Sequence, residues 1–222
     1  MKTISKILSI VLCLAMVMAL FVVGASADEN TYTKVNITSA SDITAGTYII
    51  GGEAGSAIDN GSKYAYISNT VTSNRLKGVA LTATNGTVTT SNNAVVWNLV
   101  EATGGFYLQS AANSQYVKQT DNKKVALVAS ASDATVWTVV SYNGGYTLKS
   151  ASGYLTANRF GSAGSYYLGF APYTASSSSC PCKLDFYKLG SGSVAACTHE
   201  GTGRVSVKGR KYQTNTRKSF LQ

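Results

Sequence analysis

The sequence predicts an all-β fold, and composition, internal repetition and turn chemistry are the three observations behind that prediction. Charged residues make up only 13% of the 222 residues, whereas 21 glycines and 14 tyrosines are present. This composition, with only two prolines, favours short strands joined by tight turns over long helices. We therefore expect one all-β domain over residues 28–189, flanked by segments of a different character.

The N-terminal segment, residues 1–27, has the three parts of a secretory signal peptide. Two lysines precede an apolar run over residues 7–23, and an A-x-A cleavage site ends at Ala27. We expect the mature chain to begin at Asp28, to be secreted or held at the cell surface, and to keep no stable membrane insertion. An uncleaved anchor is the alternative, because the apolar run reaches the lower limit for a spanning helix.

An internal repeat with a period of 40 residues follows the signal peptide. Residues 97–110 align without gaps on residues 137–150, and a tryptophan, a valine, a Gly-Gly pair and a leucine coincide. In each copy, two runs with alternating apolar residues surround the Gly-Gly pair, which permits the positive φ of a hairpin turn. The pattern predicts two β-hairpins whose tryptophans, Trp97 and Trp137, face the core.

Two more short strands are expected in each copy, and a third, longer copy precedes these two. The last copy closes with a strand in which Phe186 takes the place of the tryptophans. The sequence thus predicts twelve strands in three sets of four. The additional strands are expected at residues 47–50, 64–68, 79–83, 116–118, 125–129, 154–156, 167–171 and 184–189.

Three copies of four strands around an apolar centre predict a β-trefoil. The aromatic residue in every fourth strand and the recurring Tyr-Leu pairs resemble ricin-type lectin domains, and more closely the trefoil modules of secreted proteins from anaerobic gut-type bacteria. The resemblance covers about residues 31–189. Ricin-type lectins place glutamine two residues before that aromatic, whereas this chain has Val95, Thr135 and Leu184. The resemblance therefore implies the fold but not the sugar-binding residues of the family.

Asparagine followed by a basic residue recurs between the last two strands of each set. A turn asparagine beside a solvated cation explains the pattern structurally. Functionally, an amide and a cation at a loop tip bind hydroxyls or a carboxylate of a glycan, and a neighbouring ring offers a stacking surface. The predicted ligand residues are Asn74, Arg75, Asn122, Lys123, Asn158, Arg159 and Phe160.

Catalysis, cofactors and metals are not expected. The one histidine, His199, lies beyond the domain, and the chain has no sequence motif of a hydrolase or of a calcium loop. A hydrolase would need two close carboxylates, for which Asp59, Asp121 and Asp133 are the candidates.

The exported context that the signal peptide implies favours disulfide chemistry for the cysteines near the C-terminal segment. We expect a disulfide between Cys197 and either Cys180 or Cys182, and a zinc site including His199 is the alternative. Residues 190–222 are predicted to be a Gly/Ser linker and a basic disordered tail, or to mark a longer multidomain protein.

Most of the net charge of +9 lies on residues outside the domain. Residues 28–200 hold 11 basic and 10 acidic side chains, so a nucleic-acid partner is not expected. We expect a monomeric, non-catalytic lectin-like module that binds a glycan or cell-surface polysaccharide at loop sites repeated around the barrel. The alternative is a protein-interaction module, either an adhesin piece or a protease inhibitor, that uses the insertion at residues 51–63.

Overall fold

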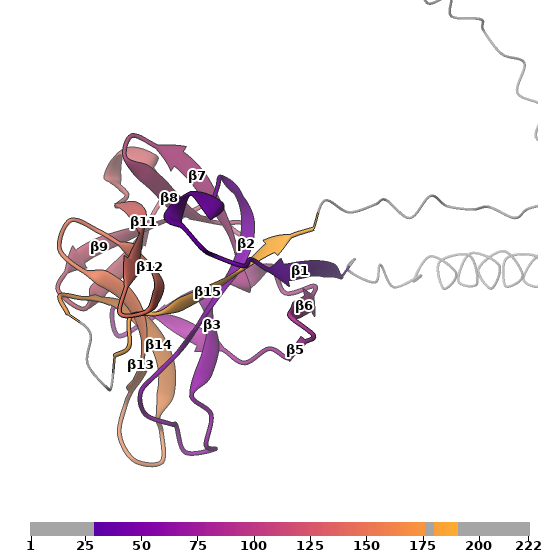
Figure 1. The fold of residues 1–222 in the computed structure, drawn as a ribbon. Coiled ribbons are helices and arrows are strands. Elements are labelled where there is room, and N and C mark those ends of the chain that lie inside the picture. The colour runs from indigo at the N-terminus through magenta and orange to yellow at the C-terminus, as the bar shows by residue number, and fades with distance from the viewer. Residues whose placement is uncertain (1–28, 176–179, 191–222) are drawn as a thin grey trace, which may run out of the picture. The chain divides into compact units, whose positions relative to one another are not determined.

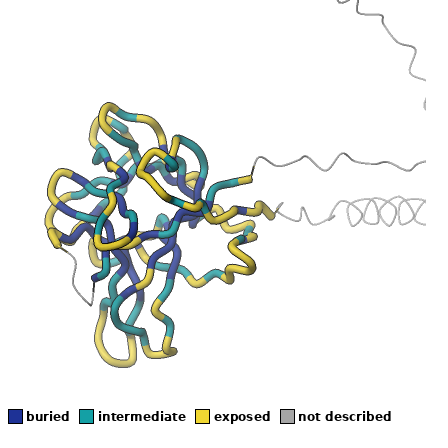
Figure 2. The backbone as a smooth tube through the Cα atoms, viewed as in Figure 1, coloured by how far each residue is buried: buried dark blue, intermediate teal, exposed yellow. Residues whose placement is uncertain are grey.

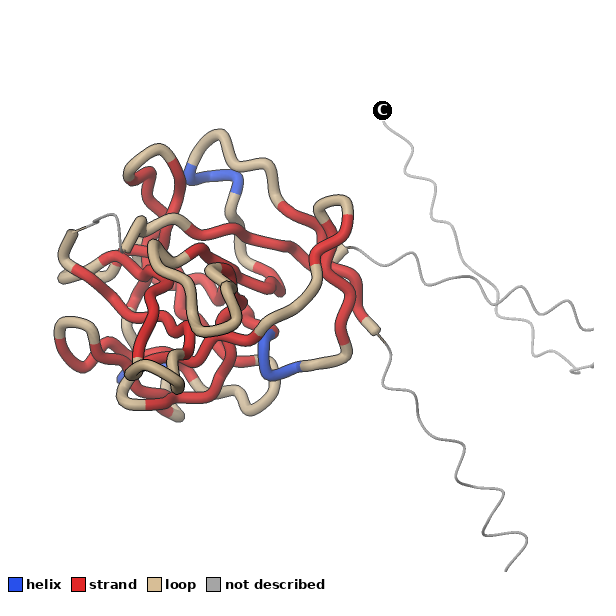
Figure 3. The backbone as a smooth tube through the Cα atoms, turned by 90° about the horizontal axis from the view of Figure 1, so that it is seen from below, coloured by secondary structure: helices blue, strands red, loops and turns tan. Residues whose placement is uncertain are grey.

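The structure is a computed structural model, and it describes residues 29–175 and 180–190. These residues form fifteen strands, all paired antiparallel, with three short 3-10 turns and no α-helix (Figure 1). The predicted all-β class is therefore confirmed, and Figure 3 shows how short the helical segments are. The predicted signal peptide (1–27) and the tail from residue 191 onward lie outside the described residues.

The strands are β1 (Asn30–Lys34), β2 (Gly46–Glu53), β3 (Tyr64–Thr72), β4 (Arg75–Val79), β5 (Ala83–Thr84), β6 (Thr87–Thr90), β7 (Val96–Ala102), β8 (Gly105–Ser110), β9 (Tyr116–Asp121), β10 (Lys124–Val128), β11 (Val136–Tyr142), β12 (Gly145–Lys149), β13 (Tyr154–Phe160), β14 (Tyr167–Tyr173) and β15 (Leu184–Leu189). The 3-10 turns are η1 (Ala40–Asp42), η2 (Asn93–Val95) and η3 (Ala131–Asp133).

Nine of the strands pair in a ring, in the order β2, β7, β8, β11, β12, β13, β14, β4, β3 and back to β2. Strand β15 pairs with β2, and the hairpin β9–β10 extends from β8. Strands β1, β6 and β5 continue outward from β15. Pairing in a ring satisfies backbone groups that a free sheet edge would leave exposed.

The two tryptophan hairpins, β7–β8 and β11–β12, are confirmed. Their turns contain Gly104 and Gly144, whose φ angles are +84° and +74°. Alternation along the strands turns Trp97 and Trp137 inward, and both are fully buried together with Phe186. The three rings belong to one apolar cluster in the interior, where Figure 2 shows the buried segments. Their predicted role as core residues is confirmed.

The expected number of twelve strands is wrong, because β1, β5 and β6 add to the sheet. A second apolar cluster attaches β1 and β6 to the outer surface of the ring, and β5 pairs with β6. The hairpin β5–β6 turns at Asn85-Gly86, where both residues have positive φ, and Asn-Gly is a strong hairpin signal. The buried members of this outer cluster are Tyr32, Ile49, Tyr66, Val88, Val95, Val96 and Tyr187.

The strand expected at residues 79–83 lies earlier in the chain, as β4. Ser73 and Asn74 have φ angles of +49° and +63°, so the chain turns tightly there and β4 begins immediately afterwards. Strand β2 in turn runs through Glu53, which leaves residues 54–63 as the actual insertion.

The two equivalent tryptophans differ in the bonding of the indole N–H, which leads to a prediction. Trp97 Nε1 donates to the carbonyl of Ile67 at 3.0 Å, whereas Trp137 Nε1 is buried with no acceptor among the described residues. An unpaired buried polar group costs about 1–3 kcal/mol. We therefore expect Trp97→Phe to lower the free energy of unfolding by about 1 kcal/mol more than Trp137→Phe.

Urea unfolding of the purified protein measures both losses. Each variant is the control for the other, because both remove the same volume from equivalent core positions. Equal losses would show that the indole hydrogen bond does not distinguish the two sites.

Candidate functional site

The three segments that carry the predicted ligand residues meet at one end of the fold. The N–H of Val125 donates to the carbonyl of Asn74 at 2.8 Å, and the N–H of Lys123 donates to that of Pro172 at 2.9 Å. Strand β14 also pairs with β4. The hairpins β3–β4, β9–β10 and β13–β14 are thus in mutual contact, and we call this region the hairpin junction. The predicted residues do not form three separate loop sites.

Most of the predicted ligand residues pack against rings at the hairpin junction. The Arg75 guanidinium lies 4.2 Å from the ring centre of Phe160, and Lys123 Nζ lies 5.1 Å from that of Tyr173. Asn158 Nδ2 donates to the Tyr173 hydroxyl at 2.9 Å. Burial raises the pKa of Tyr173, so this hydroxyl stays neutral. These contacts tie the three hairpins together, which is the structural role of the residues.

The prediction of a turn at residues 158–160 is wrong. Asn158, Arg159 and Phe160 lie in β13 and pair with β14. Because consecutive residues of a strand point to opposite faces, Arg159 points away from the hairpin junction. Its Nη1 instead donates to the carbonyl of Ala57 in the insertion, at 2.9 Å.

Cys180 and Cys182 are both buried near β13. The N–H of Cys182 donates to Thr156 Oγ1 at 2.9 Å, and burial raises the pKa of the Cys182 thiol to about 11. Cys197 and His199 lie outside the described residues, so the disulfide and its zinc alternative stay predictions. Among the residues that the structure describes, no three His, Cys, Asp or Glu side chains form a group that could hold a metal ion.

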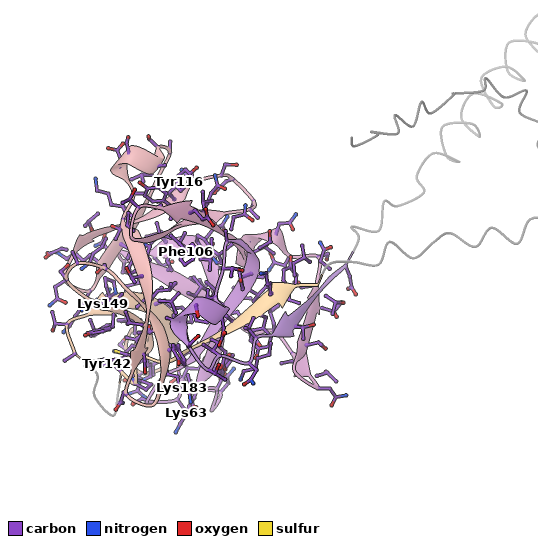
Figure 4. The ribbon with its side chains drawn as sticks, turned by 45° about the horizontal axis from the view of Figure 1, so that its top comes forward. Lys63, Phe106, Tyr116, Tyr142, Lys149 and Lys183 are labelled. Carbon is purple, nitrogen blue, oxygen red and sulfur yellow. The ribbon has the colours of Figure 1, made fainter. Side chains whose placement is uncertain are left out.

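A polar groove lies where β12 comes close to β15, and we call it the seam groove. It consists of two adjoining pockets of about 200 and 220 Å³, which share Lys34, Lys183 and Asp185. Figure 4 labels Lys183 at its position before β15. The polar side chains of the walls are Lys34 at the end of β1, Glu53 of β2, Tyr64 of β3, Tyr146 of β12, and Lys183 and Asp185 around the start of β15.

Asp185 is the centre of hydrogen bonding in the seam groove. Its Oδ1 lies 3.0 Å from Lys34 Nζ, and its Oδ2 accepts a hydrogen bond from the Tyr64 hydroxyl at 2.9 Å. Burial, followed by the nearby charge of Asp185, raises the pKa of Tyr64 far above its usual value, so the hydroxyl remains a donor. Glu53 and Lys183 are exposed at the rim. Charges of both signs therefore line one open groove.

Two glycines make room for this arrangement. A Cβ atom on Gly51 would lie 2.5 Å from the Tyr64 hydroxyl oxygen, and one on Gly145 would lie 2.5 Å from Lys183 Cγ. Gly51 is the pairing partner of Asp185, so Tyr64 crosses directly over it to reach the carboxylate. The groove residues come from distant segments, and no local motif in the sequence indicated them.

The three carboxylates considered for catalysis have separate structural roles. Asp121 pairs with Lys124 at 3.0 Å, and this hydrogen bond lowers the pKa of Asp121. Asp59 accepts a hydrogen bond from the N–H of Tyr166 at 3.1 Å, and Asp133 belongs to η3. The carboxylates that do line one pocket are Glu53 and Asp185.

Comparison with known protein families, curated proteins and solved structures gives no match to this chain. Within residues 29–175 and 180–190, no helix has the length and apolar character that a membrane span requires. Function is therefore inferred from the seam groove and the hairpin junction themselves.

Alkaline pH is expected to destabilise the fold through two tyrosines of β3, Tyr64 in the seam groove and Tyr66 in the outer cluster. Burial raises the pKa values of Tyr64 and Tyr66 above the ordinary value of 10.0. Below pH 10 both the folded and the unfolded state keep these protons, but above it only the unfolded state loses them. Stability therefore falls as the pH rises past 10.

Urea unfolding between about pH 8 and pH 11 measures this dependence. Tyr64→Phe removes one of the ionising groups, so its stability should fall less steeply above pH 10 than that of the unchanged protein. An unchanged slope in Tyr64→Phe would contradict the assignment.

Proposed function

We propose that the domain is a β-trefoil, and the roles of the strands support this. In each copy the first and fourth strands are neighbours, as β2 with β7, β8 with β11, and β12 beside β15. The second and third strands form the hairpins β3–β4, β9–β10 and β13–β14. Successive copies join through β7–β8, β11–β12 and β15–β2. The first and fourth strands of the copies would correspond to the six-stranded barrel of a trefoil, and the three hairpins to the cap at one end; these six strands are β2, β7, β8, β11, β12 and β15.

We further propose that the protein is a secreted, non-catalytic module that binds carbohydrate in the seam groove. The observation that carries this proposal is the combination of donors and acceptors in one open groove. Sugar hydroxyls both donate and accept, so a pair of neighbouring hydroxyls matches a carboxylate beside an ammonium group. Lys183 and Glu53 at the rim are the exposed groups that such a ligand would contact.

The bonding of Asp185 favours binding over hydrolysis. A glycosidase requires one carboxyl group that donates a proton to the leaving oxygen. Asp185 instead pairs with the Lys34 ammonium group through Oδ1 and accepts a hydrogen bond from Tyr64 through Oδ2, so both of its oxygens are engaged. The expected partner is a glycan or cell-surface polysaccharide, and its neutral hydroxyls suit the balanced charges of the groove.

A glycan-array screen followed by calorimetry tests this proposal. We expect Lys183→Ala and Glu53→Gln each to weaken binding of the selected neutral glycan about tenfold, because each removes a charged hydrogen bond. Both side chains are exposed, so the Tm should not change. Lys77→Ala, on the exposed face of β4, is the matched control and should bind normally. A blank array from folded protein, or full binding by both groove variants, would reject the proposal.

A protein-interaction module is the second candidate, because hydrogen bonds hold two loops together. The insertion at residues 54–63 is bound to the third copy through the Arg159–Ala57 hydrogen bond and through Asp59, which accepts from the N–H of Tyr166. Figure 1 shows the two loops projecting next to each other below β3 and β13. Loops held in place before binding lose less entropy on meeting a partner.

Inhibition of purified serine and cysteine proteases tests this second candidate. Arg159→Ala removes the hydrogen bond to Ala57 and is expected to weaken inhibition about tenfold, because the loops must then be ordered on binding. The same variant should leave glycan binding in the seam groove unchanged. If the unchanged protein inhibits none of these proteases, the protein is not an inhibitor of these two protease classes.

A further inference from the structure

The outward faces differ between the three strand pairs that join the copies. On the pair β15–β2, the outer cluster with β1 and β6 covers this face. On the hairpin β11–β12, which joins the second and third copies, the face instead borders a shallow depression of about 460 Å³. Trp137 and Val139 face the core on β11, so the alternate residues Val136, Thr138 and Val140 face outward to this depression.

The lining of the depression combines apolar and hydroxyl side chains with a single charge. Val136 and Val140 are its larger apolar members, and Thr138 and Ser150 carry the hydroxyls. Lys149 is the only charged residue in the lining, and it takes part in neither of the two ion pairs found among the described residues. The complete lining is Val136, Thr138, Val140, Lys149, Ser150 and Ala151.

Two tyrosines extend this face beside Lys149. The rings of Tyr142 and Tyr154 stack with their centres 4.0 Å apart and 22° between their planes. Lys149 Nζ lies 5.2 Å from the ring centre of Tyr154. Figure 4 shows Tyr142 and Lys149 on the same side of the domain. Both tyrosines are partly exposed, and we call them, with Lys149 and the depression, the tyrosine face.

The equivalent hairpin β7–β8, which joins the first and second copies, has no cation at this position. Gln109 stands at the position of Lys149, and Tyr116 at that of Tyr154. Gln109 Nε2 donates to the Tyr116 hydroxyl at 2.9 Å, and its Oε1 accepts from Asn98 at 3.3 Å. The polar groups on β7–β8 thus bond to each other, whereas β11–β12 presents a cation beside aromatic and aliphatic side chains.

We propose that the tyrosine face is a second carbohydrate site, and that it binds an acidic sugar. The apolar C–H face of a pyranose ring would pack on Val136, Val140 and Tyr142, while its carboxylate accepts a charged hydrogen bond from Lys149. No acidic residue lines the depression, so its charge is complementary to a uronic acid. The site is separate from the seam groove and does not require that the groove bind sugar.

Calorimetry with a galacturonic acid trisaccharide, and with a galactose trisaccharide as the neutral match, tests the proposal. We expect the acidic sugar to bind about tenfold or more tightly than the neutral one, and to bind less tightly at high salt. Lys149→Met keeps an aliphatic chain over Tyr154 but removes the charge, and should weaken binding about tenfold. Tyr142→Ala should weaken it by a similar factor, and Lys77→Met is the surface-charge control.

Each contrary outcome has a defined meaning. Equal affinity for the two trisaccharides, no binding of the acidic one, or full binding by Lys149→Met would overturn the proposal. Equal losses in Lys149→Met and Lys77→Met would indicate general charge attraction and would also overturn it. Lys183→Ala separates the two sites, because it should affect only the seam groove. If Lys183→Ala removes binding of the acidic sugar, the tyrosine face is not the site, while carbohydrate binding in the groove stands.

Discussion

The burial of one aromatic side chain from each copy is the interaction on which the rest of the structure depends. Trp97, Trp137 and Phe186 have no exposed surface and belong to one cluster. Because the side chains of a strand alternate, turning these rings inward also determines which residues face outward. Asp185 lies outside the core because Phe186 lies inside it. In the same way, Val136 faces outward because Trp137 faces the core. A register shift of one residue would bury the charge and expose the rings.

The parts of the fold that follow from local chemistry were predictable from the sequence. The hairpins around Gly104 and Gly144 combine alternation with a turn that permits positive φ, and both signals act within a few residues. The added strands were not predicted, because β1 and β6 are stable only when Tyr32 and Val88 pack on strands distant in sequence. The Asn85-Gly86 pair is a local hairpin signal from which β5 and β6 could have been predicted.

The sites were predictable only in part, because they too depend on contacts between strands that are distant in the sequence. Residue type identified Arg75, Lys123 and Asn158 as polar groups at recurring positions. It could not show that the hairpins meet, so that these groups bind neighbouring rings rather than three solvent-exposed loops. In the seam groove, Tyr64 reaches Asp185 only because β2 pairs with β15 and Gly51 leaves space between them. Such a site depends on tertiary pairing and has no continuous signature along the chain.

The pairing of β15 with both β1 and β2 has a consequence for the order of folding. Strands β1 and β2 lie near the start of the domain, whereas their partner β15 is the last strand of the described residues, so the sheet cannot be completed until residues 184–189 have been synthesised. Folds rich in contacts between distant residues also form slowly, because loop closure costs entropy before these contacts compensate for it. A partly synthesised chain that lacks β15 therefore leaves the backbone groups on one edge of β1 and of β2 without this partner.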